Sequence, residues 1–227
     1  MEPLHIIPSW FINFHVIFQA IFFVATAIIA GYAFMIYHLS KQKESRNLGL
    51  AFSFLSLSYL ILATVNMLFL SISGNTGVLE LQDITSIRMV ALILYIGFII
   101  LGFVTLFYTT LKSKSAANYI VLLVLSAIAI ILSSDKSLAI YLVASLFLIL
   151  ITINYFRNYY KTKNKNTLLI SLGMLALLLA NISLGASADY ASPNAYVLSH
   201  FLEITGYSFV ILSLVRIINN GQKKKQA

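Results

Sequence analysis

Seven long stretches of mostly apolar residues, separated by short polar segments, constrain the fold of this sequence more than any other feature. They lie at about 9–38, 48–72, 87–111, 117–133, 138–157, 167–187 and 196–218. About 20 apolar residues form a helix that crosses the hydrocarbon core of a bilayer. The pattern therefore predicts an all-α fold, in which residues 1–227 form a single polytopic bundle of seven transmembrane helices. The fourth stretch is short, and only residues 133–136 separate it from the fifth.

The composition excludes an ordinary water-soluble fold. Hydrophobic residues make up 60% of the 227 residues and charged residues 10%, whereas soluble domains are about 45–50% apolar and about 25% charged. The seven spans leave room for short loops only, so no soluble catalytic or signalling domain is expected. Cysteine is absent, which rules out disulfides, thiolate metal sites and cysteine nucleophiles.

The basic residues predict the orientation. Of the 15 lysines and arginines, only Arg88 and Lys136 fall on one side of the predicted spans, and the others fall on the opposite side. Because positive residues accumulate in cytoplasmic loops, we expect the N-terminus outside and the C-terminus in the cytoplasm of a multi-pass cell-membrane protein. The cytoplasmic loops are expected to contact anionic lipid headgroups. Such short loops offer no surface for a nucleic acid.

A layer of polar residues is predicted in the outer half of the bundle, roughly 8–15 Å below the outer surface on a rise of about 1.5 Å per residue. Polar groups in hydrocarbon are costly and are by default candidates for a functional site. His200 and Glu203 form the best candidate pair, because residues three apart share one helix face. Tyr95 and Tyr207 lie slightly deeper. The predicted outward-facing ligand pocket, between the first, second, sixth and seventh spans, comprises His15, Gln19, Asn66, Arg88, Asn181, His200 and Glu203.

Two other interpretations of this layer stay open. Histidine, asparagine and glutamine often only stitch membrane helices together. Alternatively, His15, His200 and Glu203 supply two imidazoles and a carboxylate, which suit a metal ion, and a pair of histidines suits a haem. No cofactor is predicted, and this haem or metal site of a membrane redox complex is the first alternative.

Motifs of catalysis are missing from the sequence. It contains no Gly-x-Ser-x-Gly elbow, no pair of aspartates inside the spans and no lysine in the last span for a retinal Schiff base. We therefore predict a protein that is not an enzyme.

Transport of a small solute is the third alternative. Secondary transporters tend to use helices interrupted by proline and glycine, but Pro3, Pro8 and Pro193 all lie outside the predicted spans. The first three and last three spans also show no similarity that indicates an internal repeat, unlike the seven-helix sugar carriers.

Three short segments carry a resemblance to a known class of proteins. Residues 48–52 (Leu-Gly-Leu-Ala-Phe), residues 56–59 (Ser-Leu-Ser-Tyr) and residues 200–203 (His-Phe-Leu-Glu) resemble the seven-helix membrane sensor regions of bacterial and archaeal histidine kinases and cyclases. The resemblance implies detection of a small ligand, a redox state or a membrane condition in the outer half of the bundle. Those proteins continue into an output domain, and we expect none after the seventh span of this sequence. The resemblance thus implies a sensor that signals through a separate partner, or a subunit of a membrane complex.

Overall fold

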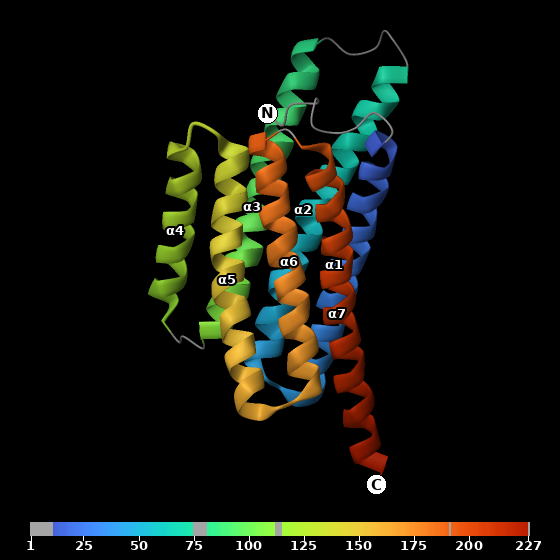
Figure 1. Cartoon of the computed structure of the whole chain (residues 1–227), viewed down its shortest axis with the longest axis vertical. Coiled ribbons are helices and arrows are strands. Elements are labelled where there is room, and N and C mark those ends of the chain that lie inside the picture. Colours follow the sequence, from blue (N-terminus) through green and yellow to red (C-terminus); the bar gives the residue numbers. More distant parts are fainter. Residues whose placement is uncertain (1–10, 75–80, 112–114, 191, 227) are drawn as a thin grey trace.

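The described residues form a bundle of seven α-helices that run along one axis (Figure 1). The computed structural model describes residues 11–74, 81–111, 115–190 and 192–226. The helices are α1 (Ile12–Ser40), α2 (Lys43–Gly74), α3 (Leu81–Leu111), α4 (Ala116–Leu132), α5 (Lys136–Thr162), α6 (Lys165–Tyr190) and α7 (Pro193–Gln226). Each helix overlaps one of the predicted stretches. The predicted all-α bundle is thereby confirmed.

Six of these helices are long and apolar enough to cross a membrane. The exception is α4, whose 17 residues have a length of about 25 Å at 1.5 Å per residue, slightly less than a hydrocarbon core of about 30 Å. The Asp135 side chain separates α4 from α5, because it accepts a hydrogen bond from the backbone N–H of Leu138 and caps the start of α5. The chain is thus an integral membrane bundle with six evident spans and one short apolar helix.

Most of the described lysines and arginines lie at one end of the bundle, which we call the basic end. The turn between α1 and α2 and the turn between α5 and α6 both lie there, and α7 ends there (Figure 1). The basic end carries Lys41, Lys43, Arg46, Arg157, Lys161, Lys163 and Lys165. The start of α1, the turn between α4 and α5, and the start of α7 lie at the opposite end.

The two turns at the basic end have the same structure. Lys41 after α1 and Lys163 after α5 are the two described residues other than glycine with positive φ, at 56° and 51°. Each donates its backbone N–H to a tyrosine carbonyl four residues earlier at 2.7 Å, Tyr37 and Tyr159 respectively. Each ammonium group also lies over that tyrosine ring, at 5.9 and 5.7 Å from the centroid. A left-handed residue with a Cβ is disfavoured, so the shared conformation is a specific feature of both turns.

Gly206 on α7 lets this helix approach α6 closely. A Cβ at Gly206 would lie 2.7 Å from Leu177 Cγ and 3.0 Å from the carbonyl oxygen of Gly173. Small residues at such positions allow membrane helices to gain van der Waals contact between their backbones.

Gly102 on α3 makes the corresponding contact with α2. A Cβ there would lie 2.8 Å from Leu55 Cγ and 3.2 Å from the carbonyl oxygen of Ala51. The sequence separation between Leu55 and Leu177 equals the separation between the two turn lysines, Lys41 and Lys163. The contact between α2 and α3 is therefore equivalent to the contact between α6 and α7.

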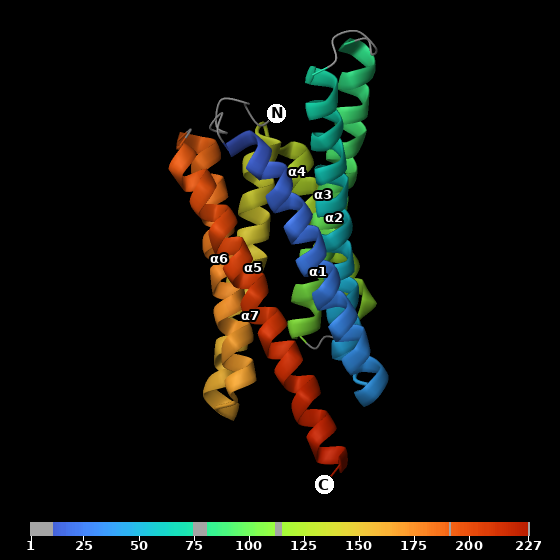
Figure 2. The same cartoon turned by 90° about the vertical axis from the view of Figure 1, so that its right-hand side faces the viewer.

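These matches reveal two units of three helices, which we call the first unit (α1, α2, α3) and the second unit (α5, α6, α7). Within each unit, the first helix packs on the second and the second on the third. The units meet where α1 contacts α7 and where α3 contacts α5, and exchanging the units interchanges these contacts, as in a symmetric dimer. Figure 2 shows the two units side by side. The expectation that the first three and last three spans form no internal repeat is therefore wrong, because the equivalence lies in the turns and helix contacts rather than in similar side chains.

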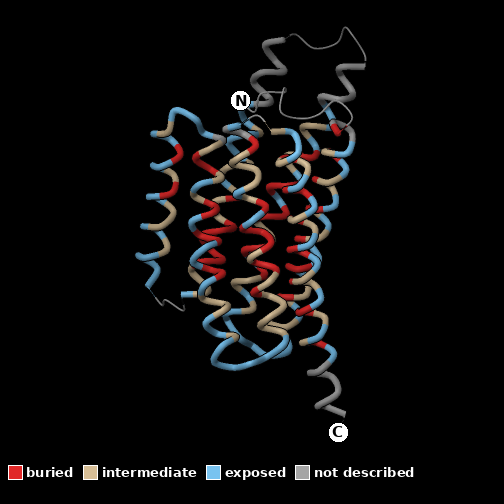
Figure 3. The backbone as a smooth tube through the Cα atoms, in the orientation of Figure 1, coloured by how far each residue is buried: buried red, intermediate tan, exposed pale blue. Residues whose placement is uncertain are grey.

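The repeat also explains α4. Because each unit has three helices, α4 is needed to return the chain so that α5 runs in the same direction as α1. It packs on α3 and α5 at the edge of the bundle, and many of its residues are exposed (Figure 3). Buried residues instead lie along the middle of the bundle, where the two units meet (Figure 3).

Candidate functional site

Five polar residues from α1, α2 and α7 form a connected group near the end opposite the basic end, which we call the histidine cluster: His15, Gln19, Asn66, Tyr196 and His200. His15 and Gln19 are one turn apart on α1, and the Gln19 amide donates to His15 Nε2. Asn66 on α2 donates to Gln19 Oε1 at 2.9 Å. On α7, Tyr196 Oη lies 2.6 Å and His200 Nε2 lies 3.3 Å from His15 Nδ1. His15 is thus the centre that links three helices.

The hydrogen bonds assign the imidazole protons of the histidine cluster. His15 Nε2 faces amide donors of Gln19 and Asn66, so its proton lies on Nδ1, directed at Tyr196 and His200. His200 Nδ1 lies 3.0 Å from the carbonyl oxygen of Tyr196 and therefore carries the proton. This leaves His200 Nε2 as the acceptor for His15.

Three aromatic rings from residues at the start of the first helix, on the same helix face as His15, pack around His200. The ring centroids of Phe11, Phe18 and Phe22 lie 5.5, 5.4 and 5.8 Å from that of His200. Phe11 and Phe18 present edge-to-face geometry, with interplanar angles of 84° and 89°. His200 is only 4% exposed. Aromatic rings packed in this way interact favourably with a flat or cationic group that lies between them.

Glu203 belongs to a second buried group, the carboxyl cluster, made of Tyr59, Glu203 and Tyr207. The Tyr59 hydroxyl donates to Glu203 Oε1, and the Tyr207 hydroxyl donates to the same oxygen at 3.4 Å. The two tyrosine hydroxyls are 2.8 Å apart. Glu203 is 7% exposed, so tyrosines rather than water solvate this carboxyl group.

Phe22 packs against both clusters. Its ring centroid lies 5.8 Å from His200, 5.4 Å from Tyr59 and 6.0 Å from Tyr207. His200 and Glu203 share a face of α7, as their spacing predicts, but they use different hydrogen-bond partners. The predicted pair is therefore divided between two neighbouring clusters.

The remaining predicted site residues differ in where they lie. The structure brings His15, Gln19, Asn66 and His200 into one hydrogen-bonded group. Asn181 on α6 is half-buried and donates to the carbonyl oxygen of Leu177 in its own helix at 3.2 Å. The side chain of Arg88 lies outside the described residues.

Five residues that form or enclose the two clusters were not among the predicted ones: Phe11, Phe18, Phe22, Tyr59 and Tyr196. A periodic signal points to Tyr196, because Tyr196, His200, Glu203 and Tyr207 recur every three or four residues on one face of α7. Tyr59 and Phe22 lie among other apolar and aromatic residues, and only the packing of α1 and α2 on α7 distinguishes them.

The geometry bears on the metal and haem alternatives. Within the described part of the chain, no group of three or more histidine, aspartate or glutamate residues could hold a metal ion. A haem between two histidines needs roughly 4 Å between the ligating nitrogens, twice a metal–nitrogen bond of about 2.0 Å. His15 Nδ1 and His200 Nε2 are 3.3 Å apart, so the macrocycle would not fit between these rings as they lie.

Comparison with known proteins adds no homologue. No protein-family model, no curated protein and no solved structure matches this chain. The assignment of function therefore depends on the geometry of the bundle and its clusters.

Proposed function

We propose that this chain is a non-enzymatic, sensor-like receptor of the cell membrane, in which the histidine cluster receives the signal and α7 conveys it. The observation that carries this proposal is the position of both clusters on α7. Tyr196, His200, Glu203 and Tyr207 are all buried, and the same helix continues to Gln226 at the basic end. A change of partner at His200 therefore acts on a rigid element that reaches the other side of the bundle.

The proposed orientation places the histidine cluster in the outer leaflet and the basic end in the cytoplasm. The accumulation of lysine and arginine at the basic end supports this orientation, and it favours contact with anionic lipid headgroups there. In this arrangement all seven helices cross the membrane, α4 included. A signalling partner, or other subunits of a complex, would engage the basic end.

Labelling of introduced cysteines tests the orientation and the number of spans. In intact cells, an impermeant thiol reagent is expected to label cysteines at Ser134 and Ser192 but not at Ser115 or Asn164. These positions lie between helices, and the natural chain has no cysteine. Labelling of Ser115 and Ser134 from the same side would show that α4 does not cross, and labelling of Asn164 would show that the orientation is inverted.

Spin labels at the basic end test the sensor function. With labels at Asn219 on α7 and Asn164 between α5 and α6, both exposed, His200→Phe is expected to shift the interspin distance by about 1–2 Å. Helix shifts of about 1–2 Å are typical of switching elements, and phenylalanine removes the polar contacts of His200 while nearly keeping its volume. The measurement is double electron–electron resonance on the full chain in nanodiscs.

A buried serine on α6 provides the control for this experiment. Ser187→Ala removes a buried hydroxyl that donates within its own helix and is expected to leave the distance unchanged. An unchanged distance in His200→Phe, with a folded protein by thermal melting, would reduce the histidine cluster to a structural link between helices.

Metal binding is the second candidate, and one distance favours it. Two nitrogens bound to a tetrahedral metal at 2.0–2.1 Å lie about 3.3 Å apart, which is the distance between His15 Nδ1 and His200 Nε2. A metal on His15 Nδ1 would move the proton to Nε2, where it faces the Gln19 amide donor unless that amide turns over. Stoichiometric metal in the purified protein, lost in His15→Leu, would replace the sensor proposal by this one.

A further inference from the structure

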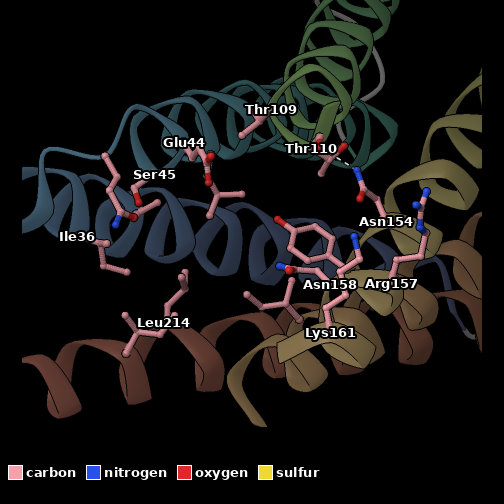
Figure 4. A pocket seen from close by; sticks show the side chains of 16 residues that line it. Ile36, Glu44, Ser45, Thr109, Thr110, Asn154, Arg157, Asn158, Lys161 and Leu214 are labelled. Carbon is pink, nitrogen blue, oxygen red and sulfur yellow. Dashed lines mark hydrogen bonds between the residues drawn. The ribbon is translucent and has the colours of Figure 1, made fainter. Parts of the chain in front are cut away.

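A cavity of about 490 Å³ opens between the two units at the basic end, well away from both clusters. Residues of α1, α2, α3, α5, α6 and α7 line it (Figure 4). Pockets of about 300–1,000 Å³ are typical of small-molecule sites. The cavity is therefore large enough for a ligand and borders both units.

The cavity lies where the repeat brings equivalent positions together. Leu48 on α2 and Ile170 on α6 both line it, as do Ile36 on α1 and Asn158 on α5. In both pairs, the two residues are separated in the sequence by as many residues as Lys41 and Lys163, the two turn lysines with positive φ. Positions equivalent in the repeat face each other across an axis, so a ligand here would contact both units at once.

Polar and charged residues line more than one part of the cavity. Arg157 and Lys161 are one turn apart on α5, both exposed, and Glu44 on α2 is the acidic residue of the lining. Asn154 donates to the carbonyl oxygen of Thr110 at 2.7 Å, which ties α5 to α3 on the same side as Arg157 (Figure 4). The lining thus has an excess of one positive charge, and both cationic groups come from the same helix face.

An apolar wall lies across the cavity from Arg157, next to Glu44 and Ser45 (Figure 4). Ile36 on α1 and Leu214 and Ile217 on α7 form this wall. In the close view, the labelled Ile36 and Leu214 lie across the cavity from Asn154 and Arg157 (Figure 4). A ligand that matches both the cationic pair on α5 and this apolar wall has an anionic group and a hydrocarbon part.

We propose that this cavity binds the phosphate group of an amphiphilic molecule, with Arg157 and Lys161 on the phosphate and the wall of α1 and α7 on its hydrocarbon. A guanidinium group forms paired, charge-assisted hydrogen bonds with phosphate oxygens, and an ammonium group adds a point charge. This second site extends the proposed receptor function. It depends on that function only for the assignment of the basic end to the cytoplasm.

Binding of short-chain lipids to the full chain in a neutral detergent tests the proposal. Dihexanoyl phosphatidylglycerol is expected to raise the melting temperature in a saturable way, more than dihexanoyl phosphatidylcholine does. Arg157→Gln with Lys161→Gln should weaken the binding of phosphatidylglycerol by about tenfold or more, because charge-assisted hydrogen bonds are lost. Asn158→Trp should abolish binding by filling the cavity without changing its charge.

The matched control is Lys43→Gln with Lys165→Gln, which removes two positive charges at the basic end outside the cavity lining. It is expected to change the affinity by less than about twofold, since exposed charges are largely screened at a Debye length of about 8 Å. An equal loss in the control and the cavity variant would show general surface attraction and overturn the proposal.

Glycerol phosphate and hexyl phosphate distinguish the source of the ligand. Saturable binding of hexyl phosphate that exceeds that of phosphatidylglycerol, and that is lost in the Arg157 and Lys161 variant, supports the same site with a soluble phosphate ester. Stronger binding of phosphatidylglycerol supports a membrane lipid. Equal binding of glycerol phosphate and hexyl phosphate would show that the apolar wall takes no part, and binding of none of the probes would overturn the site.

Discussion

Replacing Tyr59 and Tyr207 together by phenylalanine is expected to cause the largest loss of stability of any variant considered. Both hydroxyls donate to Glu203 Oε1, and the carboxyl group is buried. The double variant therefore leaves a buried acid without its donors, at a cost of about 1–3 kcal/mol for each lost hydrogen bond. The measurement is the melting temperature in one detergent, supported by a denaturant titration.

A third substitution separates this electrostatic cost from lost packing. Adding Glu203→Leu to the double variant removes the unsatisfied carboxyl group, and replacing a buried polar group by an apolar one of similar size is often nearly neutral. The triple variant is thus expected to be more stable than the double variant. Tyr160→Phe, at a tyrosine that is 66% exposed, should change stability by less than about 0.5 kcal/mol. A triple variant less stable than the double would show that Glu203 does not depend on the two tyrosines.

Alanine at Gly102 and at Gly206 is expected to destabilise the bundle by similar amounts, about 1–3 kcal/mol each, because a Cβ overfills two well-packed helix contacts. In both cases the new atom meets a leucine side chain at 2.7 Å, and a backbone carbonyl oxygen at 3.2 Å for Gly102 and 3.0 Å for Gly206. Similar losses of stability in the two variants would support the repeat, because the repeat makes these two helix contacts equivalent. Melting temperatures in one detergent report both.

Gly97 supplies the control on α3 itself. A Cβ at Gly97 meets nothing within 4 Å, so Gly97→Ala should be neutral or stabilise the helix by up to about 1 kcal/mol through helix propensity. If Gly102→Ala behaved like Gly97→Ala, α2 and α3 would not approach as closely as the structure shows. If only one of Gly102→Ala and Gly206→Ala were destabilising, the two units would not be equivalent.

The candidate site illustrates what sequence patterns predict inside a membrane. His15, Gln19, Asn66, His200 and Glu203 are conspicuous because polar side chains are costly in hydrocarbon, and the structure buries or half-buries all of them. Asn181 satisfies the same criterion but donates to its own helix, because an asparagine can bond to a carbonyl one turn earlier. The energetic cost of a polar side chain in hydrocarbon therefore identifies candidate site residues. Their hydrogen-bond partners depend on which helices face each other.

The amino-acid sequence by itself determined the membrane-helix character of this protein, the approximate bounds of its helices and the concentration of positive charge between particular helices. These properties depend on local composition, since each helix satisfies its own backbone hydrogen bonds in lipid. Only the tertiary structure decided that His200 joins His15 while Glu203 joins Tyr59 and Tyr207, and that two three-helix units enclose a cavity. Lipid is as apolar as the helix surfaces, so hydrophobicity does not specify which helices pair. Close contacts such as those at Gly102 and Gly206 specify the pairing, and they are recognisable only when both partners are in place.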